Sequence, residues 1–328
     1  MVPPAVAEAS AMLDIQLAEV KELFERELAG SPEAIMPLVR HISHFRGKML
    51  RPRLVLLSGM AAGGRSALTV DHTVLAAVVE MVHVATLVHD DVLDGADVRR
   101  RAATINHLRG NQAAVLLGDM LISHAFHLCS SLQCQQYSRL IGRTTNLVCE
   151  GELLQNLSER NWQLTPEAYY DIIYRKTASL IETSCQLGAM AAGADEAAVR
   201  ALAQFGRNIG IAFQIVDDVL DIIGSTRVVG KSLGTDIEQG KLTLPMIHFL
   251  AHADRPHRDL LMSLLESSDP DRIDHVRKLL QPTDSISYAR DEARACVQRA
   301  LTAVDNLPGS DFKLQLIEMA RYVTERET

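Results

Sequence analysis

The stretch TVLAAVVEMVHVATLVHDDVLD, at residues 73–94, decides how this chain folds. It is long and mostly apolar, so it predicts a buried helix at the centre of the protein. Its acidic end, within LVHDDVLDG at residues 87–95, returns far downstream in QIVDDVLDI at residues 214–222. The acidic pentapeptide DDVLD therefore occurs twice, each time within an apolar run, and any account of the fold and the function has to explain this repetition.

The rest of the chain also has the periodicity of helices. In AEASAMLDIQLAEVKELFEREL, residues 7–28, apolar side chains recur in steps of three and four. Alternating strand patterns with hairpin signals are nearly absent, and no break in the helical pattern reads as a domain linker. The sequence therefore predicts a single all-α domain over residues 1–328, built from about ten or more helices.

Composition and charge argue against several classes of protein. Hydrophobic residues make up 47% of the 328 residues, enough for a large core, and the net charge of −8 argues against a nucleic-acid-binding protein. The N-terminal residues show no pattern of a signal or transit peptide. No apolar stretch reaches membrane-spanning length without charged residues. We therefore expect a cytoplasmic protein with at most peripheral membrane contact.

The two acidic motifs concentrate carboxylates on helix faces. The first supplies Asp90, Asp91 and Asp94, and the second supplies Asp217, Asp218 and Asp221. Residues four apart share a helix face, where like charges cost roughly 0.2–0.5 kcal/mol per pair and burial costs more. A solvated charged face is the ordinary explanation, but the apolar flanks fit it poorly. Hard divalent cations with oxygen ligands are the natural partners, and two such helices could hold a diphosphate through Mg²⁺.

Basic residues near the motifs could contact such a diphosphate. They are Lys48, Arg51, Arg99, Arg100, Arg101, Lys176, Lys231 and Lys241. Each one alone is more often a solubilising surface residue. Their joint placement around two carboxylate motifs favours a binding site for an anionic substrate.

In these motifs the chain resembles the trans-isoprenyl diphosphate (polyprenyl) synthase family. The resemblance rests on DDVLDGADVRR, on GIAFQIVDDVLDIIGSTRVVGKSLGTDIEQGKLTLP and on EGELLQ and YYDIIYRKTASLIETSCQLGA. It implies an isoprenoid-synthase-like bundle of antiparallel helices around a central cavity, and a homodimer. It also implies condensation of isopentenyl diphosphate with an allylic diphosphate, with about three Mg²⁺ ions bound through carboxylates and substrate phosphates.

The resemblance also implies roles for single residues. The metals would be carried or supported by Asp90, Asp91, Asp94, Asp217, Asp218 and Asp221. The allylic diphosphate would contact Arg99, Lys176, Lys231 and Lys241. Isopentenyl diphosphate would bind Lys48, Arg51, His83 and Arg100, although His83 could instead be a packed helix histidine. Thr177 and Gln214 would line the reacting carbons, and Asp236 could support a lysine.

The chain departs from the family pattern at several positions. The family usually has Gly-Gly-Lys-Arg where this chain has Arg46, Gly47, Lys48 and Met49. A glycine that usually follows the arginine pair is Arg101 here, and Arg175 replaces a glycine often found before Lys-Thr. Several of the departures fall near the expected isopentenyl diphosphate site, while the carboxylates of both motifs are all present.

Product length depends on the residues one turn before the first motif. Ala85 and Thr86 are small, and a short-chain member would be expected to place an aromatic plug there. We therefore expect a long-chain polyprenyl diphosphate, with Met120 or Phe126 as the floor of the tunnel. A short-chain farnesyl or geranylgeranyl diphosphate synthase is the alternative, and the small residues could also serve only close helix packing.

Three rival functions deserve comparison. An HD-type metal phosphohydrolase could use His89 and Asp90, but it leaves the second acidic motif unexplained. A regulatory subunit without turnover would be expected to lose carboxylates, and a terpene cyclase usually replaces the second motif. Both motifs are intact here.

Overall fold

Helices account for 79% of the computed structural model, which describes residues 4–45, 47–224 and 234–325. Within these residues the strands are β1 (Val98–Arg99) and β2 (Ala102–Ala103), which form one short antiparallel pair. The predicted all-α class is confirmed.

The chain divides into two compact units, each assembled from separate segments. The first comprises Met1–Thr145, Leu180–Gly206 and Ala303–Glu318, and the second comprises Asn146–Ser179, Arg207–Thr302 and Met319–Thr328. Several long helices therefore contribute residues to both units. The expectation of a single domain stays a prediction.

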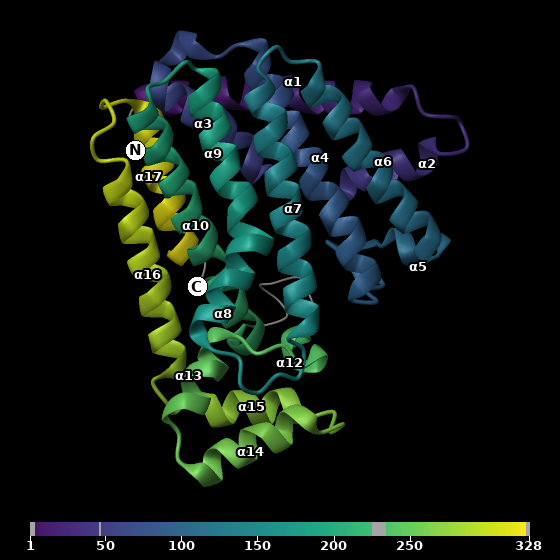
Figure 1. The fold of residues 1–328 in the computed structure, drawn as a ribbon, viewed down its shortest axis with the longest axis vertical. Coiled ribbons are helices and arrows are strands. Elements are labelled where there is room, and N and C mark those ends of the chain that lie inside the picture. The colour runs from purple at the N-terminus through teal and green to yellow at the C-terminus, as the bar shows by residue number, and fades with distance from the viewer. Residues whose placement is uncertain (1–3, 46, 225–233, 326–328) are drawn as a thin grey trace. The chain divides into compact units, whose positions relative to one another are not determined.

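The first unit is organised around the predicted central helix. Its elements are α1 (Pro4–Ala29), α2 (Met36–His41), η1 (Ile42–Phe45), α3 (Leu50–Gly63), η2 (Arg65–Ala67), α4 (Val70–Leu93), α5 (Ile105–Arg109), α6 (Asn111–Ser130) and parts of α7 (Gln135–Leu157), α9 (Ser179–Ala191), α10 (Glu196–Ile223), α16 (Ser285–Ala303) and α17 (Asp311–Glu325). Helix α4 packs against α1, α3 and α6 (Figure 1), and most of its side chains are buried. The expected buried helix at residues 73–94 is thus confirmed.

Close approaches fix α4 within this unit. His89 lies over Gly118 of α6, where a Cβ atom would come within 2.1 Å of the His89 Nε2 atom. The same Nε2 atom is 3.1 Å from the Val115 carbonyl oxygen. Because only glycine leaves room for this ring, the α4–α6 contact holds the helix turn that carries Asp90. His89 therefore supports the packing of α4 on α6.

The second unit carries the other acidic motif. It contains the remaining parts of the shared helices together with α8 (Pro166–Ile173), the π-helical turn η3 (Tyr174–Ala178), α12 (Thr235–Gln239), α13 (Leu244–His252), α14 (Arg255–Glu266) and α15 (Arg272–Leu280). Helices α14 and α15 lie side by side (Figure 1). The motif occupies the last turns of α10, whose apolar positions Ile215, Val216 and Val219 are buried.

Candidate active site

The first acidic motif ends helix α4. Asp91 is only 1% exposed, and its Oδ1 atom accepts a hydrogen bond of 2.6 Å from the Arg99 Nε atom. Asp90 is partly exposed, and Asp94 is exposed at the C-cap of the helix. The three aspartates therefore differ: Asp91 is buried and holds an arginine, whereas Asp90 and Asp94 are more exposed.

A β-hairpin carries the arginines that follow this motif. Arg100 and Arg101 form its turn with φ angles of 51° and 65°. A two-residue turn with both φ angles positive is of type I′, which favours Asn-Gly over bulky residues. The glycine missing at position 101 therefore leaves backbone strain in this turn.

The hairpin is fastened to the segment before α3. Arg100 donates a hydrogen bond to the Phe45 carbonyl oxygen, and the His41 Nε2 atom is 2.6 Å from the Ala103 carbonyl oxygen. The Arg100 guanidinium also lies so close to Gly47 that a Cβ atom there would be 2.3 Å from it. This anchoring places Arg100 beside the residues that open α3.

The predicted isopentenyl diphosphate residues Arg51, His83 and Arg100 lie together. Burial lowers the pKa of His83 well below its usual value, and the positive charges of Arg51, Arg100 and Arg99 lower it further. Burial also lowers the pKa of Arg51 to about 10, although the charge of Glu80 opposes this change. His83 is therefore neutral beside charged arginines. Lys48 is exposed in the loop before α3.

The second acidic motif is built around a hydrogen-bonded chain. Thr177 donates its hydroxyl to the Gln214 Oε1 atom at 2.8 Å, and Gln214 Nε2 donates to Asp218 Oδ1 at 2.8 Å. The Tyr169 hydroxyl donates to Asp218 Oδ2 at 2.6 Å. Burial raises the pKa of Asp218 well above its usual value, and the nearby charge of Asp236 raises it further. Both oxygens of Asp218 are thus engaged by neutral donors.

Asp221 closes the motif by binding backbone amides. Its carboxylate accepts hydrogen bonds from the N–H groups of Gly234, Thr235 and Asp236, at 3.1, 3.4 and 3.1 Å. Asp221 therefore fixes the start of α12. Asp217 is partly exposed.

Asp236 lies within the same carboxylate cluster. Burial and then the charge of Asp221 raise its pKa to about 7, while Lys241 and Lys176 act to lower it. The suggested role of Asp236 beside a lysine thus agrees with its surroundings. Lys231 lies outside the described residues.

The π-helical turn η3 displays Lys176 and Thr177. Extra residues in a π-turn often mark functional sites because they redirect side chains. The Lys176 Nζ atom lies 2.5 Å from Glu152 Oε2 and donates to Gln155 Oε1 at 2.7 Å. Arg175, which replaces the usual glycine, pairs with Asp171 and Glu150. The substitution is therefore accommodated by two carboxylates.

The residues expected to set product length lie on α4 and α6, which pack together. Ala85 is fully buried, whereas Thr86 is partly exposed and donates its hydroxyl to the His83 carbonyl oxygen at 2.8 Å. Met120 and Phe126 are partly exposed on α6. Their roles stay predictions.

The donor set suits a divalent cation that also binds a substrate. In the second unit, burial and, to a smaller extent, like charges raise the pKa values of Asp218, Asp221 and Asp236, so a cation would stabilise the charged carboxylates. Within the described residues, no group of three or more His, Cys, Asp or Glu side chains is arranged to hold an ion alone.

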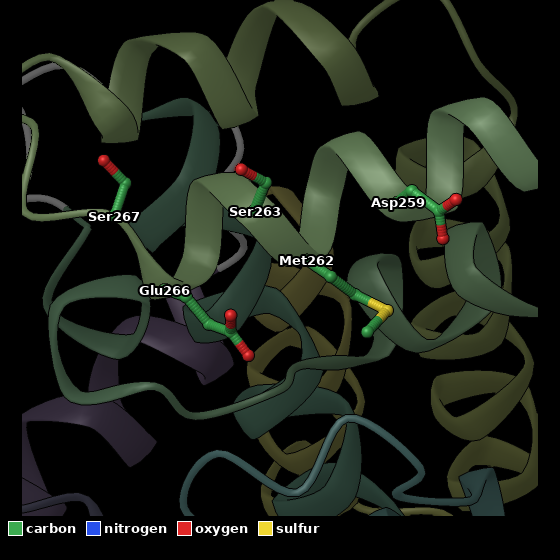
Figure 2. Close-up of a pocket in the computed structure, with 5 residues that line it drawn as sticks. All are labelled: Asp259, Met262, Ser263, Glu266 and Ser267. Atoms are coloured by element: carbon green, nitrogen blue, oxygen red, sulfur yellow. The ribbon is translucent and has the colours of Figure 1, made fainter.

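A surface hollow along α14 does not belong to this chemistry. Figure 2 shows its lining residues, which are Asp259, Met262, Ser263, Glu266 and Ser267. Glu266 accepts a hydrogen bond of 2.9 Å from the Trp162 indole. With no basic side chain in its lining, the hollow is a poor site for a diphosphate.

Two buried side chains of the candidate site were not among the predicted residues. Tyr169 was not singled out, although a buried tyrosine hydroxyl needs a hydrogen-bond partner. Glu80 was not singled out either, although one acidic residue within the apolar stretch TVLAAVVEMVHVA was visible. A lone buried carboxylate signals a nearby cation.

Comparisons with known proteins show the family of this chain. Residues 32–282 match the Polyprenyl synthetase family. The octaprenyl diphosphate synthase of Haemophilus influenzae is 34% identical over 98% of this chain and 97% of its own length. A decaprenyl diphosphate synthase from Rhodobacter capsulatus has a TM-score of 0.89 at 32% identity, covering 98% of both chains.

A third similar protein has been solved with ligands. It is a polyprenyl synthase from Caulobacter crescentus in complex with calcium and isoprenyl diphosphate, with a TM-score of 0.90 at 30% identity over 98% of both chains. The expected resemblance is confirmed, and the rival functions are not favoured. This chain belongs to the polyprenyl synthetase family and is a trans-prenyltransferase of isoprenoid biosynthesis.

Proposed function

We propose that this enzyme condenses isopentenyl diphosphate with an allylic diphosphate, using Mg²⁺, to make a long-chain polyprenyl diphosphate. The observation that carries the proposal is the setting of the two acidic motifs. Both retain every aspartate, and each lies near cationic side chains of its own unit, Arg99 in the first and Lys176 and Lys241 in the second. The named long-chain relatives and the calcium-bound homologue support the same reaction.

The residues of the site suit the departure of diphosphate from the allylic substrate. When bound, Mg²⁺ ions, about three in number, would neutralise the charge that develops on this leaving group. Asp90, Asp94 and Asp217 would hold the ions. Arg99, held by Asp91, and Lys176, held by Gln155 and Glu152, are fixed donors that contact the diphosphate without reorganising.

The second substrate would use the cluster in the first unit. Arg51 and Arg100 supply charge for the diphosphate of isopentenyl diphosphate, and neutral His83 supplies a hydrogen bond. Lys48 can reach from the preceding loop. Thr177 and Gln214, joined by a hydrogen bond, would lie along the reacting carbons.

Product sizing tests the proposal directly. The enzyme is incubated with labelled isopentenyl diphosphate, several allylic primers and Mg²⁺, and the products are separated by length. We expect a long-chain product that requires both the primer and the metal. Release of inorganic phosphate without condensation would contradict the proposal.

Chain length is tested separately with Ala85→Phe. A phenyl ring one turn before the first motif would block elongation, so we expect shorter products. Ala85→Leu provides a smaller plug, and Val70→Phe is the control because Val70 is exposed at the start of α4. An unchanged product length in a folded Ala85→Phe enzyme would refute this role.

Assembly and location are further parts of the proposal. We propose a homodimer in the cytoplasm with at most peripheral membrane contact. Among the described residues, α4 and α6 are long and apolar enough to span a membrane by length and composition, but α4 is mostly buried, as a core helix is. Sedimentation velocity and membrane flotation test these points; a monomer or an integral membrane protein would contradict them.

A further inference from the structure

Glu80 is a buried carboxylate in the middle of the apolar helix α4. It is 2% exposed and lies one helical turn before His83. Burying a carboxylate in an apolar environment is costly unless cations or hydrogen bonds compensate. The local surroundings of Glu80 must therefore supply positive charge.

Two arginines from different elements supply it. Arg51 comes from the first turn of α3, which packs on α4, and Arg100 comes from the β1–β2 turn. The negative charge of Glu80 raises the pKa of both arginines against the effect of burial. The charge of Arg100 lowers the pKa of Arg51, so the two guanidinium groups repel each other, and the carboxylate of Glu80 offsets this repulsion.

The arrangement repeats that of Asp91 on the same helix. Asp91 and Glu80 are eleven positions apart, close to three full turns, so they share a face of α4. Asp91 holds Arg99, and the charge of Glu80 acts on the next residue of the hairpin, Arg100. One helix face thus provides a carboxylate for each member of the arginine pair.

We propose that Glu80 is a positioning residue that holds Arg51 and Arg100 together so that both can bind the diphosphate of isopentenyl diphosphate. This inference rests on the proposed function, because it assigns that substrate to the cluster. Glu80 does not touch the substrate; it offsets the repulsion between two cations that must converge on one anion.

The test is a steady-state analysis of Glu80→Gln in the full-length enzyme. We expect KM for isopentenyl diphosphate to rise by about 30-fold, because displaced arginines lose their shared geometry. KM for the allylic primer should change less than about 2-fold. Asp71→Asn is the matched control, since it removes a carboxylate from the first turn of the same helix and should leave both constants unchanged.

A double-mutant cycle separates positioning from a merely structural role. In an Arg100→Gln background, Glu80→Gln should raise KM for isopentenyl diphosphate by well under half of the factor that it causes in the otherwise unaltered enzyme, because the partner of Glu80 is gone. Fully multiplicative effects would overturn the inference. If Glu80→Gln does not fold, Glu80→Asp carries the same test, with a smaller rise expected in KM for isopentenyl diphosphate only; equal rises for both substrates would overturn it.

Binding measurements distinguish failure of this inference from failure of the proposed function. Calorimetry with isopentenyl diphosphate should show binding to the unaltered enzyme and weakened binding to Glu80→Gln. Equal affinities would refute the role of Glu80 alone. Absence of both binding and condensation in the unaltered enzyme would refute the proposed function as well.

Discussion

The two copies of DDVLD have the same five residues but different physical surroundings. In α4, the middle carboxylate Asp91 is compensated by a charged partner, Arg99. In α10, the equivalent Asp218 is compensated by two neutral donors, Tyr169 and Gln214. The last aspartates differ as well, because Asp94 is exposed while Asp221 binds the backbone that starts α12.

This difference shows that a motif fixes which atoms are available but not how their charge is compensated. An ion pair compensates the Asp91 carboxylate and fixes the Arg99 side chain. At Asp218, burial and then the charge of Asp236 raise the pKa, and the hydrogen bonds from Tyr169 and Gln214 oppose this rise only in part; a metal ion would reverse it. The first motif is therefore preorganised by charge, and the second depends more on its ligands.

The largest effect is expected for the first aspartate of each motif, Asp90 and Asp217, which is partly exposed in both. Asp90→Ala and Asp217→Ala each remove a leading carboxylate, so condensation should fall by about 1000-fold as charge stabilisation of the leaving group is lost. Initial rates with saturating Mg²⁺ measure this. A variant that keeps a tenth of the activity would contradict the shared metal-binding role.

The middle carboxylates should differ in their contribution to stability. Asp91→Asn leaves Arg99 without its charged partner in a buried place, which should cost about 3 kcal/mol. Asp218→Asn retains a similar shape, and its amide oxygen can accept one of the two hydrogen bonds; because it also removes a carboxylate that burial disfavours, we expect a loss of about 1 kcal/mol. Urea unfolding of the metal-free enzyme measures both. Equal losses would remove the distinction between the two motifs.

Tyr169→Phe is expected to have a smaller effect on stability than Asp91→Asn. The change deletes the donor to Asp218 Oδ2 and should cost about 1–2 kcal/mol in the free energy of unfolding. Activity should also fall, since Asp218 holds Gln214 and, through it, Thr177. Tyr170→Phe is the control, because Tyr170 donates to Glu292 rather than to the motif. Similar activity in both variants would argue against the hydrogen-bonded chain.

The smallest effect concerns the hairpin that serves the first motif. Arg101→Gly should stabilise the protein by about 1 kcal/mol, because glycine adopts a positive φ without strain. Thermal unfolding at fixed pH measures the gain. Arg109→Gly is the comparison, since it places glycine within helix α5 and should destabilise. A destabilised Arg101→Gly variant would show that the side chain matters more than the turn.

The helices could be predicted from the sequence because their apolar period is strong. The expected central helix at residues 73–94 is observed at Val70–Leu93. The resemblance named the candidate residues, and the structure groups Arg51, His83 and Arg100 in one unit and Lys176, Asp218 and Lys241 in the other. These groupings leave the individual catalytic roles as predictions.

The partners of the buried carboxylates could not be predicted. Glu80 lies far in sequence from both Arg51 and Arg100, and no periodicity connects residues on different elements. The backbone amides that bind Asp221 carry no sequence signal at all, because every residue type except proline supplies the same N–H group. The role of Tyr169 could not be predicted for a similar reason, because its hydrogen-bond partner Asp218 is remote in the sequence.

The most direct test is a crystal structure of the enzyme with Mn²⁺ and a non-hydrolysable allylic diphosphate analogue. Anomalous scattering locates the metal without ambiguity. We predict manganese beside each acidic motif, bound by Asp90 or Asp94 in the first and by Asp217 in the second, and in contact with diphosphate oxygens. A bound analogue with no metal at either motif would contradict the account.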